Sequence, residues 1–165
     1  MLFRRNCLRT VVLLVSVVVC QTSCYGESSI YLFLPSVAHM INGRIDLNGT
    51  ESFEFQGGLK KESWVHGINY PIRIYQECRK KVIIKSEGKV LISYSADKFD
   101  IRNGNVIKDY WKAEIQVNCM DGSEHYIRVA PKGFSNCQLK FMTPKEVKKR
   151  ISDEKYVLLD DYIKE

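Results

Sequence analysis

The chain has 165 residues and a formal net charge of +6, with 25 lysine and arginine residues against 19 aspartate and glutamate residues. Three of the basic residues, Arg4, Arg5 and Arg9, precede the first acidic residue, Glu27, which leaves 22 basic against 19 acidic groups beyond them, a net of +3. So balanced a charge does not imply the strongly basic surface typical of nucleic-acid-binding domains, and we expect no direct contact with nucleic acid.

The first 26 residues have the pattern of an export segment. The three arginines precede an apolar run of about ten residues, Val11 to Cys20, in which no acidic residue occurs. This length is typical of a signal-peptide core and falls short of the roughly 17 residues that a membrane-spanning helix needs. Small residues at Cys24 and Gly26 suit cleavage before Glu27, but the cut site is indistinct. Residues 1–26 are therefore interpreted as a signal peptide or an N-terminal membrane anchor.

Residues 27–142 are predicted to form one β-rich domain outside the cytoplasm. Short stretches of alternating or β-branched residues are separated by tight-turn dipeptides, which is the pattern of hairpin-connected strands. Three asparagine–glycine pairs are each predicted to form a hairpin turn: Asn42-Gly43, Asn48-Gly49 and Asn103-Gly104. A further hairpin is expected to join residues 82–84 to residues 90–92.

The clearest expected strand pair joins residues 111–119 to residues 125–130 through a glycine-containing turn. If Cys119 faces His125, then Val117 faces Ile127, and the apolar side chains of both strands gather on one face.

The C-terminal segment, residues 143–165, is predicted to be helical and to pack on the β-domain. Thr143-Pro144-Lys145-Glu146 has a capping hydroxyl, proline at the first helical position and glutamate three residues after the cap. The helix is expected to end near Ile151, and a second helical or extended piece follows with Tyr156, Leu159 and Ile163. Together the elements predict a mainly β fold, an antiparallel sandwich or a barrel-like domain with a C-terminal helix.

Three cysteines lie outside the leader, in a compartment that favours disulfides. A bridge between Cys119 and Cys137 is the first expectation, and pairing of Cys78 with Cys137 is the alternative. The remaining thiol is expected to be buried, to meet Cys24 in a retained leader, or to link two copies of the chain as a homodimer. The spacing of the cysteines does not match a metal site.

No catalytic or cofactor-binding motif occurs in the sequence, so we expect no enzymatic activity, no cofactor and no metal ion. Three histidines, His39, His66 and His125, are candidates for pH sensing because imidazole titrates between pH 5 and 8. His125 is the foremost of them, since the expected strand pair places it on the inward face beside Cys119, where burial disfavours its protonated form.

The layout of the chain resembles that of the small accessory membrane proteins encoded beside pH-regulated enteric fimbriae, the MyfF and PsaF type. The resemblance is carried by Arg4, Arg5 and Arg9, the apolar run 11–19 and the strands from residue 72 to residue 137. It implies an inner-membrane protein with a periplasmic domain, which works with a membrane-bound transcription activator to switch on fimbrial genes in acid and warmth. It implies no functional residue.

Two functions are therefore expected as alternatives. In the first, the protein is a non-enzymatic accessory protein that is held in the inner membrane and binds and stabilises the membrane-bound activator through its periplasmic domain. In the second, it is a cleaved periplasmic or secreted β-domain that binds a ligand or a protein, as an adhesin subunit or an inhibitor does. Four aromatic residues are candidates for a binding face in either case: Trp64, Tyr70, Tyr110 and Trp111.

Overall fold

The computed structural model of the protein describes residues 26–133, 136–152 and 156–164. The expected signal peptide or anchor lies outside these ranges, except for Gly26. Within the described part of the chain, no helix has the length and the apolar character needed to cross a bilayer.

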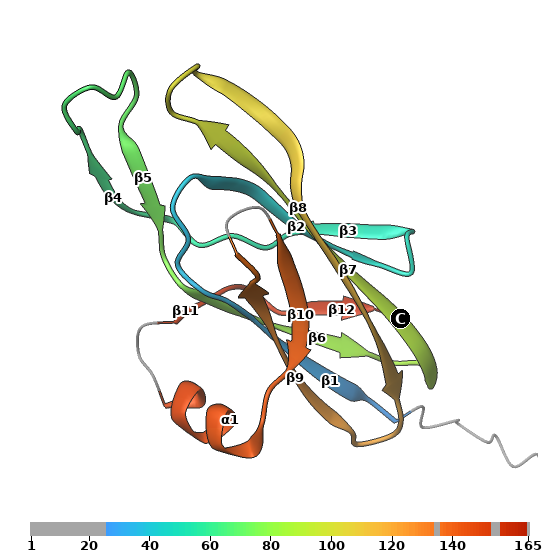
Figure 1. Ribbon diagram of the computed structural model, residues 1–165. Coiled ribbons are helices and arrows are strands. Elements are labelled where there is room, and N and C mark those ends of the chain that lie inside the picture. The colour runs from blue at the N-terminus through green and yellow to red at the C-terminus, as the bar shows by residue number, and fades with distance from the viewer. Residues whose placement is uncertain (1–25, 134–135, 153–155, 165) are drawn as a thin grey trace, which may run out of the picture.

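Two β-sheets that pack face to face form the body of the protein, and a separate hairpin extends from it (Figure 1). The larger sheet has the order β10-β9-β1-β6-β11, with β12 also paired to β6. Its strands are β1 (Ser28–Leu34), β6 (Cys78–Ile84), β9 (Glu124–Pro131), β10 (Cys137–Phe141), β11 (Val157–Leu158) and β12 (Tyr162–Lys164). The smaller sheet has the order β3-β2-β7-β8 and contains β2 (Met40–Leu47), β3 (Glu51–Glu54), β7 (Gly88–Asp100) and β8 (Asn105–Cys119).

The separate hairpin pairs β4 (Leu59–Ser63) with β5 (Ile72–Tyr75), and one helix, α1 (Pro144–Ile151), follows the last strand of the sandwich. The expected mainly β fold with a C-terminal helix is confirmed, and it takes the sandwich form. The pairing is mostly antiparallel, although β1 runs parallel to β9, and β11 and β12 run parallel to β6.

Alternate residues of both sheets point into one shared core. Ile30 and Leu32 of β1, Ile92 of β7 and Val117 of β8 are all buried there. Burial of each such side chain contributes roughly 1.5–3 kcal/mol relative to an exposed one. The period-two alternation in the sequence therefore decides which face of each strand becomes core.

The strand partners differ from those expected for residues 111–119 and 125–130. In β8, Val117 pairs with Val90 of β7, whereas Ile127 of β9 pairs with Leu32 of β1 and Phe141 of β10. The turn between β8 and β9 thus carries the chain from one sheet to the other. The expected hairpin between residues 82–84 and 90–92 is wrong for the same reason, because β6 and β7 belong to different sheets.

Two of the three asparagine–glycine pairs form hairpin turns as predicted. Asn48-Gly49 joins β2 to β3, and Asn103-Gly104 joins β7 to β8. Asn42-Gly43 instead lies inside β2, where the pairing with β7 shifts at a β-bulge. Gly43 is required at this bulge, since a Cβ atom on it would lie 2.6 Å from the carbonyl oxygen of Phe55.

A buried carboxylate holds three strands together at this bulge. Asp97 of β7 accepts hydrogen bonds from the Asn42 amide at 2.9 Å, the Lys108 ammonium at 2.9 Å and the backbone N–H of Asp109 at 2.9 Å. Both neighbours of β7 are irregular beside it, since the β7–β8 register also shifts between Ala96 and Lys98. Burial by itself would raise the pKa of Asp97, but these hydrogen bonds outweigh it and lower the pKa to about 2.

The capping box predicted at Thr143 is confirmed. The Thr143 hydroxyl accepts a hydrogen bond from the backbone N–H of Glu146 at 3.3 Å, and the Glu146 carboxylate accepts one from the backbone N–H of Thr143 at 2.9 Å. Val147 of α1 packs against a second apolar cluster of Phe33, Met142 and Tyr156. The residues after the helix that the structure describes are extended rather than helical, and form β11 and β12 beside β6.

All three cysteines of the domain are buried free thiols, so neither the Cys119–Cys137 bridge nor the Cys78–Cys137 bridge is formed. Cys78 on β6 and Cys137 on β10 have two strands between them. At the usual spacing of ~4.8 Å this separates them by about 14 Å, whereas disulfides need Cα atoms within about 7 Å. Cys119 ends a strand of the other sheet. Burial raises the pKa of Cys78 to about 12 and that of Cys137 to about 11.

The Asp97→Asn substitution is expected to lower the free energy of unfolding at pH 7 by about 2 kcal/mol. Because the pKa of Asp97 is lower in the folded chain than its ordinary value of 3.8, its carboxylate stabilises the fold above about pH 4. That contribution is lost as the pH falls from about 4 to about 2. Urea unfolding across this range measures it, with Asp160→Asn as the exposed control. Parallel pH profiles for the wild type and Asp97→Asn would contradict the assignment.

The three buried thiols are expected to resist a thiol reagent in the native chain and to react fully once it is unfolded, because burial keeps them protonated and covered. Peptide mass mapping of Cys78, Cys119 and Cys137 before and after denaturation checks this. A mass lower by two hydrogens in a peptide pair, recovered without reductant, would show that one of the predicted bridges forms after all.

Candidate functional site

Two hairpin ends project from the same side of the sandwich and form a feature that we call the arm (Figure 1). The arm consists of residues 59–75, which contain β4 and β5, and residues 99–107, which contain the turn between β7 and β8. The β4–β5 hairpin is held by cross-strand pairing, in which Glu62 lies opposite Arg73 and the two side chains form an ion pair at 2.8 Å.

Tyr70 joins the two hairpins of the arm. Its ring packs edge-on against the ring of Phe99, with the centroids 5.4 Å apart, and the neighbouring Asn69 amide donates a hydrogen bond to the Arg102 carbonyl at 2.9 Å. Gly104 lies beneath Tyr70 at a φ of 69°, and a Cβ atom there would lie 2.2 Å from the Tyr70 hydroxyl oxygen. The glycine therefore provides both the turn and the space for this contact.

The arm exposes large apolar side chains on both of its hairpins. Trp64 is 68% exposed and Val65 is 46% exposed on the first hairpin, and Val106 and Ile107 are exposed on the second. A tryptophan with this much accessible surface contributes little to the stability of the fold, and aromatic residues are enriched where proteins bind one another. The arm is therefore a candidate protein-interaction surface.

The four aromatic residues proposed from the sequence for a binding face divide into two groups. Trp64 and Tyr70 lie in the arm and are exposed. Trp111 is buried in the core, and Tyr110 is partly buried and packs against the core. The sequence does not indicate that Val106 and Ile107 belong to a binding face, because β-branched residues in a strand are typical of a buried core. They are exposed because this hairpin projects beyond the sandwich, and no local sequence pattern signals such a projection.

His39 lies where the arm joins the sandwich. Its backbone N–H donates to the Arg73 carbonyl of β5 at 3.1 Å, and its carbonyl accepts from the Phe99 N–H of β7 at 2.9 Å. The backbone of His39 has a positive φ of 63°, which is uncommon for a residue other than glycine. Burial, and then the nearby charge of Lys98, lower the pKa of His39 below its ordinary value of 6.5.

The other two candidate histidines lie elsewhere. His66 is exposed in the turn of the β4–β5 hairpin, and His125 is half-buried on β9 with Nε2 3.2 Å from the Ser123 hydroxyl. The Ser123 hydroxyl lies 2.8 Å from the Ser28 hydroxyl, which in turn forms a hydrogen bond with the Cys119 thiol, so two hydroxyls link His125 to Cys119. Among the described residues, no three His, Cys, Asp or Glu side chains are grouped closely enough to hold a metal ion.

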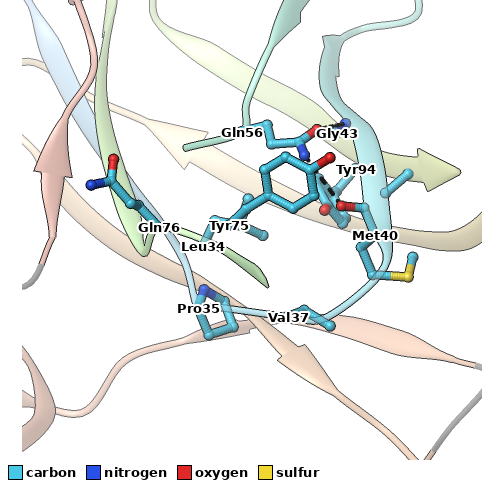
Figure 2. Close-up of a pocket in the computed structure, with 10 residues that line it drawn as sticks. Leu34, Pro35, Val37, Met40, Gly43, Gln56, Tyr75, Gln76 and Tyr94 are labelled. Atoms are coloured by element: carbon cyan, nitrogen blue, oxygen red, sulfur yellow. Dashed lines mark hydrogen bonds between the residues drawn. The ribbon is translucent and has the colours of Figure 1, made fainter. Parts of the chain in front are cut away.

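A small internal cavity lies under the β2 bulge and is too small for a ligand. Gln56 spans the bulge, with its side chain accepting from the Gly43 N–H at 3.0 Å and donating to the Met40 carbonyl at 3.2 Å (Figure 2). The cavity beside it, lined by Leu34, Tyr75, Tyr94 and their neighbours, has a volume of about 10 Å³. This holds about one water molecule, so the cavity is a packing feature of the bulge.

A scan against protein-family models, a search of curated proteins and a search of solved structures each found no match to this chain. The resemblance to accessory proteins of pH-regulated fimbriae therefore stays a prediction from the layout of the sequence.

The His39→Asn substitution is expected to reduce the loss of stability in mild acid. Because the pKa of His39 is lowered in the folded chain, the unfolded chain takes up a proton first as the pH falls below about 6.5, and the free energy of unfolding decreases. Asparagine tolerates the positive φ and does not titrate. Chemical unfolding between about pH 7.5 and pH 5 measures the slope, with His66→Asn as the exposed control. An unchanged slope in His39→Asn would contradict this role.

Proposed function

We propose that the protein is a non-enzymatic accessory protein that binds and stabilises a membrane-bound transcription activator controlling fimbrial gene expression. The observation that supports binding most directly is the exposure of Trp64, Val65, Val106 and Ile107 on the arm. Contact with a partner would remove these side chains from water, and the two packed hairpins hold them in place before binding.

The proposed compartment follows from the sequence of the leader. Residues 1–26 would hold the protein in the inner membrane, with the sandwich and the arm in the periplasm. The partner is then a second membrane protein with a periplasmic segment, which meets the arm outside the cytoplasm. His39 gives the proposal a route to pH dependence, because its protonation is disfavoured at the point where the arm joins the sandwich.

Replacement of both Trp64 and Val65 by alanine is expected to weaken binding of the activator by about 30-fold or more, since truncation of a central interface tryptophan commonly costs about 2 kcal/mol. The free energy of unfolding should change little, because both side chains are exposed. Co-isolation of the activator from membranes and its cellular level measure the loss. Leu158→Ala, which truncates a side chain 67% exposed on β11, is the matched control. Equal loss in both variants, or no loss in either, would contradict the proposed role of the arm.

The proposed membrane location has a separate test. Native cells are separated into membrane and soluble fractions, and the intact mass of the chain is measured in each fraction. A membrane-bound chain that retains Met1 supports an anchored accessory protein. A soluble chain that begins near Glu27 contradicts it and favours the alternative, a cleaved β-domain that binds a ligand or protein outside the membrane.

A further inference from the structure

The C-terminal segment covers one edge of the larger sheet in two short pieces. We call residues 157–164 the strap; it contains β11 and β12, which both run parallel to β6 (Figure 1). β11 pairs two residues with β6, and β12 pairs three. At the break between them, the Lys80 ammonium of β6 donates a hydrogen bond to the Asp160 carbonyl at 2.6 Å. The strap therefore pairs β6 at both of its ends.

An aromatic ring and a carboxylate of β3 hold the end of the strap. The Tyr162 ring stacks on the Phe53 ring, with the centroids 4.4 Å apart. The Glu51 carboxylate accepts a hydrogen bond from the Tyr162 hydroxyl at 2.9 Å and lies 3.1 Å from the Lys164 ammonium. Because β3 is an edge strand of the smaller sheet, the strap links the edges of the two sheets.

The strap contributes little to the core of the protein. No residue of the strap is buried: Leu159 and Tyr162 are partly buried against the core, and Val157, Leu158 and Ile163 are exposed. The middle of the strap also borders a hollow of about 240 Å³. Its pairing with β6 is short and parallel, and parallel pairing is slightly less stable per residue than antiparallel pairing. The strap can therefore open while the core remains packed.

Tyr156 fixes the point from which the strap extends. Its side chain is buried in the second apolar cluster, where its ring packs edge-on against the Phe33 ring with the centroids 5.4 Å apart. The Arg150 guanidinium donates a hydrogen bond to its hydroxyl. This anchor does not involve the strap, so opening from residue 157 leaves it in place.

Opening of the strap would leave main-chain groups along β6 without their present partners. The Glu77 carbonyl accepts from the Val157 N–H, and the Arg79 carbonyl accepts from the Leu159 N–H, each at 2.9 Å. The Lys85 N–H, just beyond the end of β6, donates to the carbonyl of the last strap residue at 3.0 Å. An edge that exposes such groups can accept another extended strand.

We propose that the strap is a displaceable cover over a strand-binding edge on β6. It opens as a unit from residue 157 while the sandwich stays folded, and an extended segment of a partner protein takes its place. That segment runs parallel to β6 and has the chemistry of the strap, an aromatic ring that stacks on Phe53 and a cation that meets Glu51. The edge contains no residue of the arm, so this proposal and the proposed function can fail separately.

Amide hydrogen exchange in the native full chain tests the opening. After correction for intrinsic rates, the amides of Val157, Leu159 and Lys85 are expected to exchange with one common free energy and little dependence on denaturant. Their exchange should be at least about 100-fold faster than that of the amide of Phe55, a fully buried residue. Exchange only through global unfolding, or three different free energies, would overturn the proposed opening.

A fluorescent peptide with the sequence of residues 156–164 is the probe for the edge, and anisotropy measures its binding to the full chain. Tyr162→Ala in the chain loosens its own strap and leaves β3 and β6 unchanged, so this variant is expected to bind the peptide about tenfold more tightly than the wild type. Leu158→Ala, at an exposed position of the strap, is the matched control and should bind the peptide as the wild type does. If Tyr162→Ala does not fold, Lys164→Met removes only the ion pair with Glu51, and about threefold tighter binding is expected.

Equal affinity of the peptide for the wild type and the loosened variant overturns the proposal, and so does a gain of the same size in Leu158→Ala. Replacement of both Trp64 and Val65 by alanine should leave peptide binding unchanged, because both residues lie in the arm. This result separates the strand-binding edge from the surface proposed to bind the activator.

Discussion

The carboxylate of Asp97 is the constraint on which the shape of this protein most depends. It lies inside the smaller sheet and is fully satisfied by donors from both neighbouring strands, Asn42 on one side and Lys108 and Asp109 on the other. An unpaired charge at that depth would be strongly unfavourable, so the two bulges that bring these donors to it are fixed together. A slip of one residue in either strand would turn its apolar face away from the core.

Backbone strain is concentrated around the same carboxylate. Three residues other than glycine have positive φ angles there or beside it: His39, Asn42 and Asp109. Each such conformation costs roughly 1–3 kcal/mol and persists only where the surroundings enforce it. The strain coincides with the base of the arm, which is where the chain departs from a regular sandwich. The attachment of the arm to the sandwich therefore passes through this strained junction, where His39 bonds to Arg73 and Phe99.

Local features of the fold could be predicted from the sequence, and long-range ones could not. The capping contact joins Thr143 and Glu146, which are three residues apart, and the pattern reveals it directly. Alternation placed Val117 in the core, but alternation carries no information on which strand lies alongside. Asn42-Gly43 has the same residues as a hairpin turn, yet it forms a bulge because its amide binds Asp97, 55 positions later. The arm joins two hairpins that lie apart in the sequence, so no single stretch of sequence signals it.

The place of β1 in the larger sheet has a consequence for how the chain reaches its fold. β1 begins at Ser28 and pairs with β6 on one side and with β9 on the other. β6 begins only at Cys78, and β9 only at Glu124. A chain leaves the ribosome or a translocation channel N-terminus first, so this apolar strand emerges long before either partner exists. Loop closure over such separations makes folding slow, and an unpaired apolar strand is prone to aggregate meanwhile. The larger sheet can therefore be completed only after β9, which ends at Pro131, has emerged.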